Sequence, residues 1–171
     1  MSILNIEIKA RCGNVEKIKA ILKELGADFK GIDHQIDTYF KVESGRLKLR
    51  QGNIENSLIF YKRSNISGPK KSEVLLERLE SDNGMRELLL ASNGLLVEVD
   101  KERAIYFIEN VKFHLDEVKE LGTFVEIEAI DRDGSIGIEK LHLQCSKFME
   151  LFGIQPSDLV DCSYSDLLRK S

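Results

Sequence analysis

The sequence has little proline, little cysteine and no run of apolar residues that dominates any segment. Two prolines in 171 residues, with no repeat or low-complexity segment, leave no evident linker, so we expect a single domain over residues 1–171. The three cysteines (Cys12, Cys145 and Cys162) are widely separated and form no CxxC motif, which argues against a zinc site or a disulfide framework. We therefore expect the protein in a reducing cytoplasm.

An excess of positive charge is missing as well. The formal net charge is −4, which argues against a surface built to bind a nucleic acid polymer, so any basic site must be local. No apolar stretch reaches the length of a membrane span, and the N-terminus lacks the apolar segment of a signal peptide, so we expect no membrane association. With 42% hydrophobic and 32% charged residues, the composition is that of an ordinary soluble domain.

What the sequence does have is alternation with a period of two, the pattern of strands with one apolar and one polar face. It begins at residues 5–12 (NIEIKARC) and returns in seven further stretches: 35–42, 45–50, 57–63, 73–80, 95–107, 111–118 and 123–130. Helical spacing predicts helices over 15–25 (capped by Asn14), near 85–91, over 136–153 and over 164–170. We predict an α+β fold in which a closed eight-stranded antiparallel β-barrel has its helices packed on the outside.

The parity of the charged residues indicates a polar barrel interior. In residues 97–103, Lys101 and Arg103 share a face with two valines, whereas three acidic residues occupy the opposite, wet face. A single such pair usually marks a solvated face, but the same arrangement recurs on several strands: Lys48 with Arg50, Glu126 with Glu128, and His114 with Asp116. Because buried charges are costly unless they are paired, hydrated or bound, we expect a ligand-filled tunnel.

The interior charges predict a particular ligand chemistry. Carboxylates suit hard divalent cations, and the candidates are Glu7, Asp116, Glu126 and Glu128. Lysine and arginine donors suit phosphate oxygens, and the candidates are Lys9, Lys48, Arg50, Lys101 and Arg103, with either Arg63 or Lys62. Together they favour Mg²⁺ or Mn²⁺ bound to a polyphosphate, since each part neutralises another.

Several segments, in order along the chain, resemble the CYTH superfamily of triphosphate tunnel metalloenzymes. They are IEIKAR, DTYF, GRLKLR, KER, HLDEVKELGTFVEIEA and YSDLL. The likeness is closest to the class IV adenylyl cyclase branch, and the superfamily also includes thiamine and inorganic triphosphatases. The resemblance implies an eight-stranded barrel that binds a triphosphate and a divalent metal.

The resemblance also implies roles for individual residues. The metal ligands would be Glu7, Glu126 and Glu128. The substrate contacts would be Lys9, Lys48, Arg50 and Arg63, with Lys62 as the alternative to Arg63, and Lys70 would lie at the tunnel mouth. The catalytic residues would be Lys101, Arg103 and Asp116. Asp116 would be a metal ligand or would help to deprotonate the nucleophile. One departure stands out, because the first glutamate of the family's E-x-E-x-K motif is Asn5 here, which brings an oxygen but no charge.

Three functions remain open from the sequence. The leading hypothesis is conversion of ATP to cyclic AMP and pyrophosphate; the alternative is a triphosphatase acting on thiamine triphosphate, tripolyphosphate or a nucleoside triphosphate. A third hypothesis is a barrel that binds a phosphorylated ligand without turnover. A barrel for an apolar ligand fits poorly, since interior parity selects charges. The expected partner is a small molecule containing a triphosphate, and the resemblance makes a homodimer an expectation.

Overall fold

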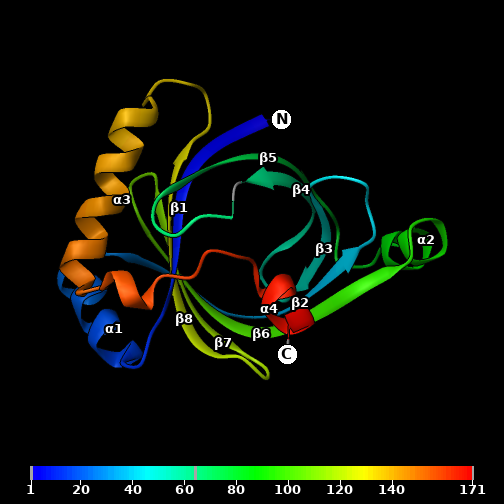
Figure 1. Cartoon of the computed structure of the whole chain (residues 1–171), viewed down its shortest axis with the longest axis horizontal. Helices are drawn as coiled ribbons and strands as arrows, with labels where there is room; N and C mark the ends of the chain where they lie inside the picture. The colour runs from blue at the N-terminus through cyan, green and yellow to red at the C-terminus, as the bar shows by residue number, and fades with distance from the viewer. Residues whose placement is uncertain (1, 64, 171) are drawn as a thin grey trace.

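Eight strands curl into one closed ring, with four α-helices outside it (Figure 1). The computed structural model describes residues 2–63 and 65–170. Its elements in chain order are β1 (Ser2–Arg11), α1 (Val15–Glu24), β2 (Asp28–Phe40), β3 (Arg46–Gly52), β4 (Asn56–Arg63), β5 (Lys70–Arg78), α2 (Met85–Ser92), β6 (Leu95–Ile108), β7 (Val111–Val118), β8 (Gly122–Asp131), α3 (Ile138–Phe152), the 3₁₀ turn η1 (Pro156–Asp158) and α4 (Tyr164–Lys170).

The strand order around the ring is β1-β5-β4-β3-β2-β6-β7-β8, and every neighbouring pair is antiparallel. The first strand closes the barrel, because β1 pairs with β5 on one edge and with β8 on the other. Leu4 accordingly lies opposite Glu73 on β5 and opposite Asp131 on β8. Closure gives every strand a paired neighbour on each side, so the sheet has no edge strand over the described residues. The predicted barrel is confirmed.

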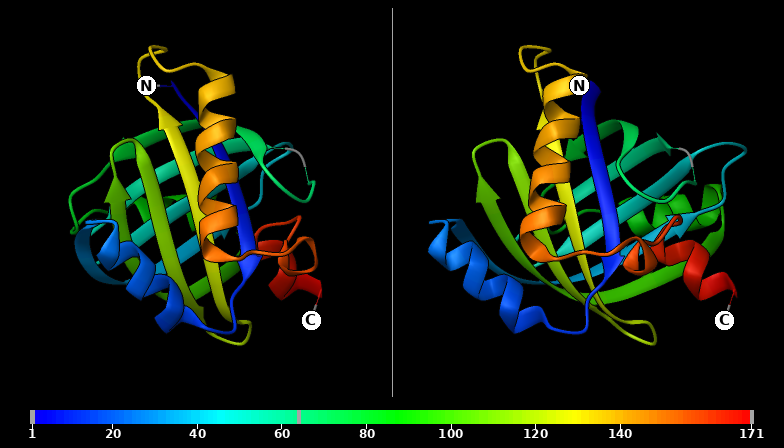
Figure 2. Two further views of the ribbon diagram at one scale, coloured as in Figure 1. Left: turned by 90° about the vertical axis from the view of Figure 1, so that its left-hand side faces the viewer. Right: turned by 60° about the vertical axis from the view of Figure 1, so that its left-hand side comes forward.

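The main hydrophobic core lies outside the barrel, between its wall and two helices. Helices α1 and α3 cover the outer faces of β1, β7 and β8 (Figure 2). Ile6 and Ile8 of β1 and Phe113 of β7 are buried there, and the ring of Phe113 meets that of Phe148 on α3 edge-on with 4.8 Å between centroids. Because the apolar side of each strand is used for this packing, its polar side faces the barrel interior.

A smaller apolar cluster closes the barrel at the end where α4 lies. Tyr39, Val99 and Phe124 are buried in it, and the ring of Tyr164 at the start of α4 lies 5.0 Å from the ring of Phe124. The segment before α4 is tied to β1, since the Val160 amide donates to the carbonyl of Lys9 at 2.9 Å. These contacts bring the C-terminal residues to the barrel.

Three strands begin three or more residues before their predicted starts. Strand β1 begins at Ser2 rather than at residue 5, and strand β5 begins at Lys70 rather than at residue 73. Strand β2 begins at Asp28 rather than at residue 35, because a register shift between Phe29 and Gly31 interrupts the alternation of its first half. The Asn14 cap of α1 is confirmed, since its side chain accepts from the Lys17 amide. Within the described ranges, no helix is both long and apolar enough to cross a membrane.

Candidate active site

Charged side chains from six of the barrel strands line one interior cavity of about 130 Å³. Where a strand contributes more than one residue, these lie two apart, as strand geometry requires of side chains that share a face. Among the described residues, the cationic side chains are Lys9, Lys48, Arg50, Arg63, Lys101, Arg103 and Lys112, and the carboxylates are Glu7, Glu55, Glu126 and Glu128. Seven cations against four carboxylates make the lining suited to an anion.

The cations on one side of the cavity are held by Asp37, which is completely buried. Arg50 binds both its carboxylate oxygens at 2.9 Å, and Lys101 donates to Oδ2 at 2.6 Å. The Nζ of Lys48 lies 3.6 Å from the same oxygen. Burial alone would raise the pKa of Asp37, but these three cations hold it well below its usual value. Asp37 is therefore a permanent counter-charge behind the cavity wall.

A second buried carboxylate, Asp116, fixes the guanidinium of Arg103. Two parallel hydrogen bonds of 2.7 Å join them, and the hydroxyl of Tyr164 donates to Asp116 Oδ2 at 2.7 Å. Both oxygens of Asp116 are thus occupied, and the residue does not line the cavity. Burial would raise its pKa, but Arg103 lowers it. The arrangement fixes the guanidinium of Arg103, which lines the cavity, and engages both oxygens of Asp116.

Glu126 lies at the centre of the charge network. The guanidinium of Arg103 donates to it at 3.3 Å, Lys9 Nζ is 3.8 Å away, and Nδ1 of His114 is 3.6 Å from Oε2. Burial opposes ionisation, yet Lys9 and Arg103 hold the pKa of Glu126 well below its usual value. His114 is buried beside these cations, and burial followed by the charge of Arg103 lowers its pKa to about 3. The imidazole is therefore neutral at physiological pH.

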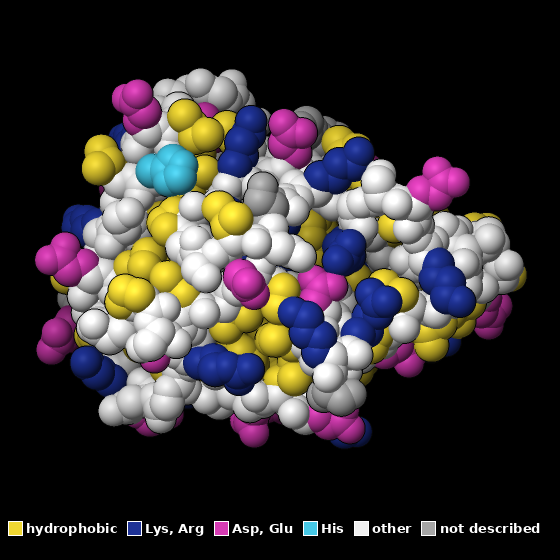
Figure 3. Space-filling view, in the orientation of Figure 1, with side chains coloured by type: hydrophobic (Ala, Val, Ile, Leu, Met, Phe, Trp, Pro, Cys, Tyr) yellow, Lys and Arg dark blue, Asp and Glu magenta, His cyan; other side chains and the backbone are white. Residues whose placement is uncertain are grey.

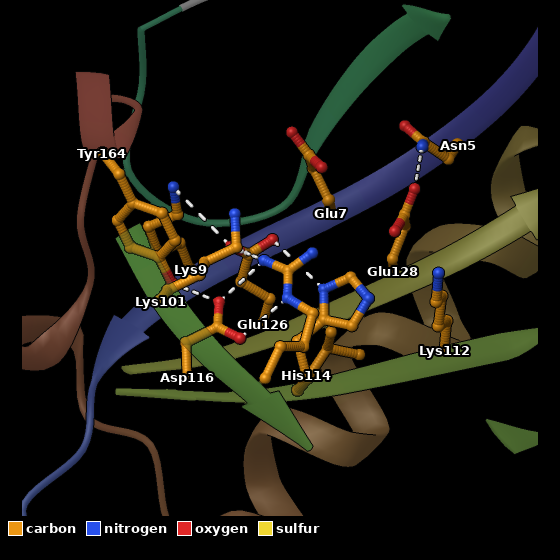
Figure 4. A network of polar contacts seen from close by, with 12 residues as sticks. Asn5, Glu7, Lys9, Lys101, Lys112, His114, Asp116, Glu126, Glu128 and Tyr164 are labelled. Carbon is orange, nitrogen blue, oxygen red and sulfur yellow. Dashed lines mark hydrogen bonds and ion pairs between the residues drawn. The ribbon is translucent and has the colours of Figure 1, made fainter. Parts of the chain in front are cut away.

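The remaining carboxylates, Glu7 and Glu128, lie directly opposite each other on β1 and β8. Glu7 is hydrogen-bonded to Arg63. Glu128 accepts a hydrogen bond from the side-chain amide of Asn5 (Figure 4). Burial and then the charge of Glu7 raise the pKa of Glu128. The Oδ1 atom of Asn5 is buried and has no hydrogen-bond partner among the residues that the structure describes. This side of the cavity carries negative charge and an unpaired oxygen.

This donor set fits a hard divalent cation in its chemistry. Carboxylates and a neutral amide oxygen are the ligands that Mg²⁺ and Mn²⁺ take, and a cation here would relieve the repulsion that raises the pKa of Glu128. Over residues 2–63 and 65–170, however, no three His, Cys, Asp or Glu side chains are already gathered closely enough to hold a metal ion. Binding would therefore require the carboxylates to exchange their present partners.

Burial lowers the pKa values of three lysines that line the cavity. Burial lowers the pKa of Lys9 to about 8, although Glu126 opposes the shift, and burial lowers that of Lys101 to about 8 against the charge of Asp37. The pKa of Lys48 lies well below its usual value because of burial and the neighbouring Arg50. A bound polyanion would stabilise the protonated form of all three.

The structure gathers nine of the eleven site residues predicted from sequence around the cavity. They are Glu7, Lys9, Lys48, Arg50, Arg63, Lys101, Arg103, Glu126 and Glu128. Asp116 lies behind Arg103, and Lys70, opposite Glu7 on β5, is buried with its Nζ donating to the carbonyl of Ile66. Lys62, the alternative to Arg63, is exposed on the outer face beside the ring of Phe60.

Sequence reasoning missed several residues of this network. Asp37 belongs to the quoted DTYF segment and shares the inward parity of Gln35 and Tyr39, so its position could have been found in the same way as that of Lys101. Glu55, which lies in a loop, and Tyr164, which reaches the cavity from α4, give no such signal. The Tyr164 ring lies under Lys9, with 3.7 Å from Nζ to its centroid.

A closed antiparallel barrel whose interior carries buried cations and carboxylates defines a β-barrel protein with a charged tunnel. The chain belongs to the CYTH domain family, whose model matches residues 4–155. A protein of Methanocaldococcus jannaschii named "Putative adenylate cyclase" is 25% identical, with 96% of this chain and 98% of that protein covered.

Solved structures share the same fold. The PH1012 protein of Pyrococcus horikoshii is 28% identical with a TM-score of 0.78, and the match covers 95% of this chain and 98% of that one. A Hippeastrum protein, described as a "putative adenylyl cyclase" with a dominant triphosphatase activity, has a TM-score of 0.65 at 18% identity, covering 97% and 95% of the two chains. At that identity the likeness concerns the fold alone.

Proposed function

We propose that this protein is a divalent-metal-dependent enzyme that binds the triphosphate of its substrate inside the barrel and cleaves a phosphoanhydride bond. The observation that carries the proposal is the single cavity in which seven cationic side chains face four carboxylates. Phosphoryl chemistry depends on positioning and on neutralising charge that develops on phosphate oxygens, and such a lining supplies both.

Lys9, Lys101 and Arg103 would contact the phosphates. Their charges are fixed in advance: Arg103 is held by two hydrogen bonds to Asp116, and Lys101 by one to Asp37. Preorganised donors of this kind act on a leaving group without reorganising during the reaction. In this proposal Asp116 is a positioning residue rather than a proton acceptor, because Arg103 and Tyr164 occupy both its oxygens.

Glu7, Glu126 and Glu128, with the free oxygen of Asn5, would hold Mg²⁺ or Mn²⁺. When bound, the metal would neutralise phosphate charge and lower the pKa of coordinated water. Asn5 contributes an oxygen without a charge, so we expect weaker metal binding on its side than a glutamate there would give. Release of Glu7 from Arg63 would also free that guanidinium for a phosphate oxygen.

Two nucleophiles are compatible with this phosphate site. Attack by the substrate's own 3′-hydroxyl would convert ATP to cyclic AMP and pyrophosphate, and the name of the Methanocaldococcus jannaschii relative, which matches almost the full length of both chains, supports this candidate. Attack by water would make the protein a triphosphatase. The activity described for the Hippeastrum structure supports that second candidate.

The test is to incubate the purified protein separately with ATP, thiamine triphosphate and tripolyphosphate, in Mg²⁺ or Mn²⁺, and to resolve the products. Cyclic AMP with pyrophosphate would support cyclisation, and a diphosphate with orthophosphate would support hydrolysis. We expect Lys101→Ala to abolish turnover and Lys71→Ala, an exposed lysine on β5, to retain it. Binding of tripolyphosphate without turnover of any substrate would contradict an enzymatic role and leave a non-catalytic binder.

A further inference from the structure

The tunnel adjoins two cavities of different chemistry, and it shares lining residues with each. One lies beside α4 and has Arg46, Arg63 and Asp166 in its lining; Lys and Arg side chains gather beside α4 on that face (Figure 3). The other lies near Ile3 at the start of β1. We call this second cavity the Phe107 mouth; its apolar lining consists of Ile3, Ile54, Leu76, Leu79, Ile105 and Phe107.

The Phe107 mouth is continuous with the tunnel. The two cavities share four lining residues: Glu55, Ser57, Leu76 and Lys112. A molecule with its phosphates in the tunnel can therefore extend directly into the mouth. The ring of Phe107 is flanked by two lysines, with Nζ of Lys112 at 5.7 Å and Nζ of Lys30 at 6.0 Å from its centroid. An aromatic face beside apolar side chains is a platform on which a planar ring can stack.

We propose that the Phe107 mouth binds a neutral heteroaromatic group joined to the triphosphate, as in a nucleoside triphosphate. The inference rests on the proposed function, and it selects among the substrates that function allows. Four cations (Lys30, Arg78, Lys112 and Arg132) and two carboxylates (Glu55 and Glu77) line the mouth. This excess of positive charge disfavours binding of the cationic thiazolium ring of thiamine triphosphate. Tripolyphosphate has no group that would contact the apolar lining of the mouth.

Calorimetry in EDTA tests the subsite apart from catalysis, using ATP, thiamine triphosphate and tripolyphosphate as ligands. We expect ATP to bind most tightly and Phe107→Ala to weaken ATP roughly tenfold, since stacking of one base on an aromatic ring is worth that order of affinity. Tripolyphosphate affinity should not change. Phe29→Ala is the matched control, because Phe29 is a half-exposed ring outside both cavities.

Two results would overturn the inference. One is tighter binding of thiamine triphosphate or tripolyphosphate than of ATP, and the other is an equal loss of all three ligands in Phe107→Ala. The failure of the proposed function looks different, because it would appear as wild-type protein that binds ATP in the mouth but cleaves none of the three compounds with Mg²⁺ or Mn²⁺.

A separate observation concerns His114, whose ring lies against the cavity. Both ring nitrogens are buried without a hydrogen-bond partner among the described residues. Because ionised Glu126 can only accept, the ring nitrogen nearest to it, Nδ1, carries the proton, and Nε2 presents a lone pair. The nearby cations are already engaged, with Arg103 on Asp116 and Lys112 on Glu55.

The lone pair of Nε2 selects its ligand. Phosphate oxygens are acceptors as well, so they cannot hydrogen-bond to it. We infer that Nε2 of His114 accepts a hydrogen bond from the O–H group that attacks the phosphate, either water or a sugar hydroxyl, and so orients it. The role is therefore the positioning of the nucleophile by a hydrogen bond.

Steady-state kinetics on the best wild-type substrate tests this role. We expect His114→Leu to lower kcat roughly tenfold with little change in KM, and His114→Gln, which restores a neutral acceptor, to recover part of the loss. The control is His142→Leu, a substitution at an exposed position of α3. Long-range ¹H–¹⁵N spectra of the imidazole should show the Nδ1–H tautomer.

A rise in KM at unchanged kcat would overturn the inference, as would equal losses in the Leu and Gln variants or an Nε2–H tautomer. Unaltered turnover in His114→Leu would remove this role alone. Absence of turnover in the wild-type protein would remove the proposed function together with it.

Discussion

Replacing Asp37 by asparagine removes the buried counter-charge of three cations without changing the size of the side chain. The carboxylate is fully buried and binds Arg50 through two hydrogen bonds and Lys101 through a third. Removing one partner of a buried ion pair costs about 3–5 kcal/mol, because the remaining charges are left without compensation. For a chain of this length each kcal/mol lowers Tm by roughly 2–4 °C, so we expect a decrease of about 6–20 °C.

The assay is thermal unfolding followed by circular dichroism, with and without tripolyphosphate. Asp28→Asn, on the same strand, is the matched control, because Asp28 pairs with Lys30 on the exposed surface and such pairs contribute less than about 1 kcal/mol. Tripolyphosphate should raise Tm more in Asp37→Asn than in wild type, since the ligand supplies the missing negative charge. A Tm for Asp37→Asn within about 2 °C of wild type would refute the reasoning.

Three further predictions concern the cavity. Tripolyphosphate binding should weaken as pH rises through about 8, because burial lowers the pKa of Lys9 and Lys101 to about 8 and phosphate binds their protonated forms. Equal affinity on both sides of that pH, measured by calorimetry, would contradict this. Tyr164→Phe keeps the ring beneath Lys9 but removes the hydroxyl that holds Asp116, so kcat should fall roughly tenfold with the circular dichroism spectrum unchanged. Glu128→Gln should leave Tm equal or higher at neutral pH, since the raised pKa means that the ionised form is penalised in the fold, yet titration calorimetry should show weaker Mg²⁺ or Mn²⁺ binding in the presence of tripolyphosphate.

Much of the fold could be predicted from sequence because the relevant signal is local. Alternation along β1, β6 and β8 gives the strands and also tells which side chains share a face. The first half of β2 escaped prediction, since the irregularity near Gly31 breaks that alternation. A local period is visible only where the strand is regular.

The site was less predictable where a residue's role depends on a distant partner. Parity places Asp116 inside the barrel but says nothing of Tyr164, which lies 48 residues later and occupies one of its oxygens. The resemblance places Lys70 at the tunnel mouth, but it does not predict that the ammonium donates to the carbonyl of Ile66. Which charges remain available to a ligand is decided by tertiary pairing, and no sequence spacing encodes it.

Strand β1 packs through one side and carries its polar groups on the other, and this separates two kinds of selection along it. Ile6 and Ile8 pack against the helices, whereas Asn5, Glu7 and Lys9 line the tunnel. In a saturation mutagenesis scan of this strand, substitutions at the two isoleucines should chiefly reduce folding, whereas substitutions at the tunnel positions should reduce catalysis more than folding. Asn5 illustrates the result, because a change of charge at this position leaves the packing of the adjacent Ile6 in place.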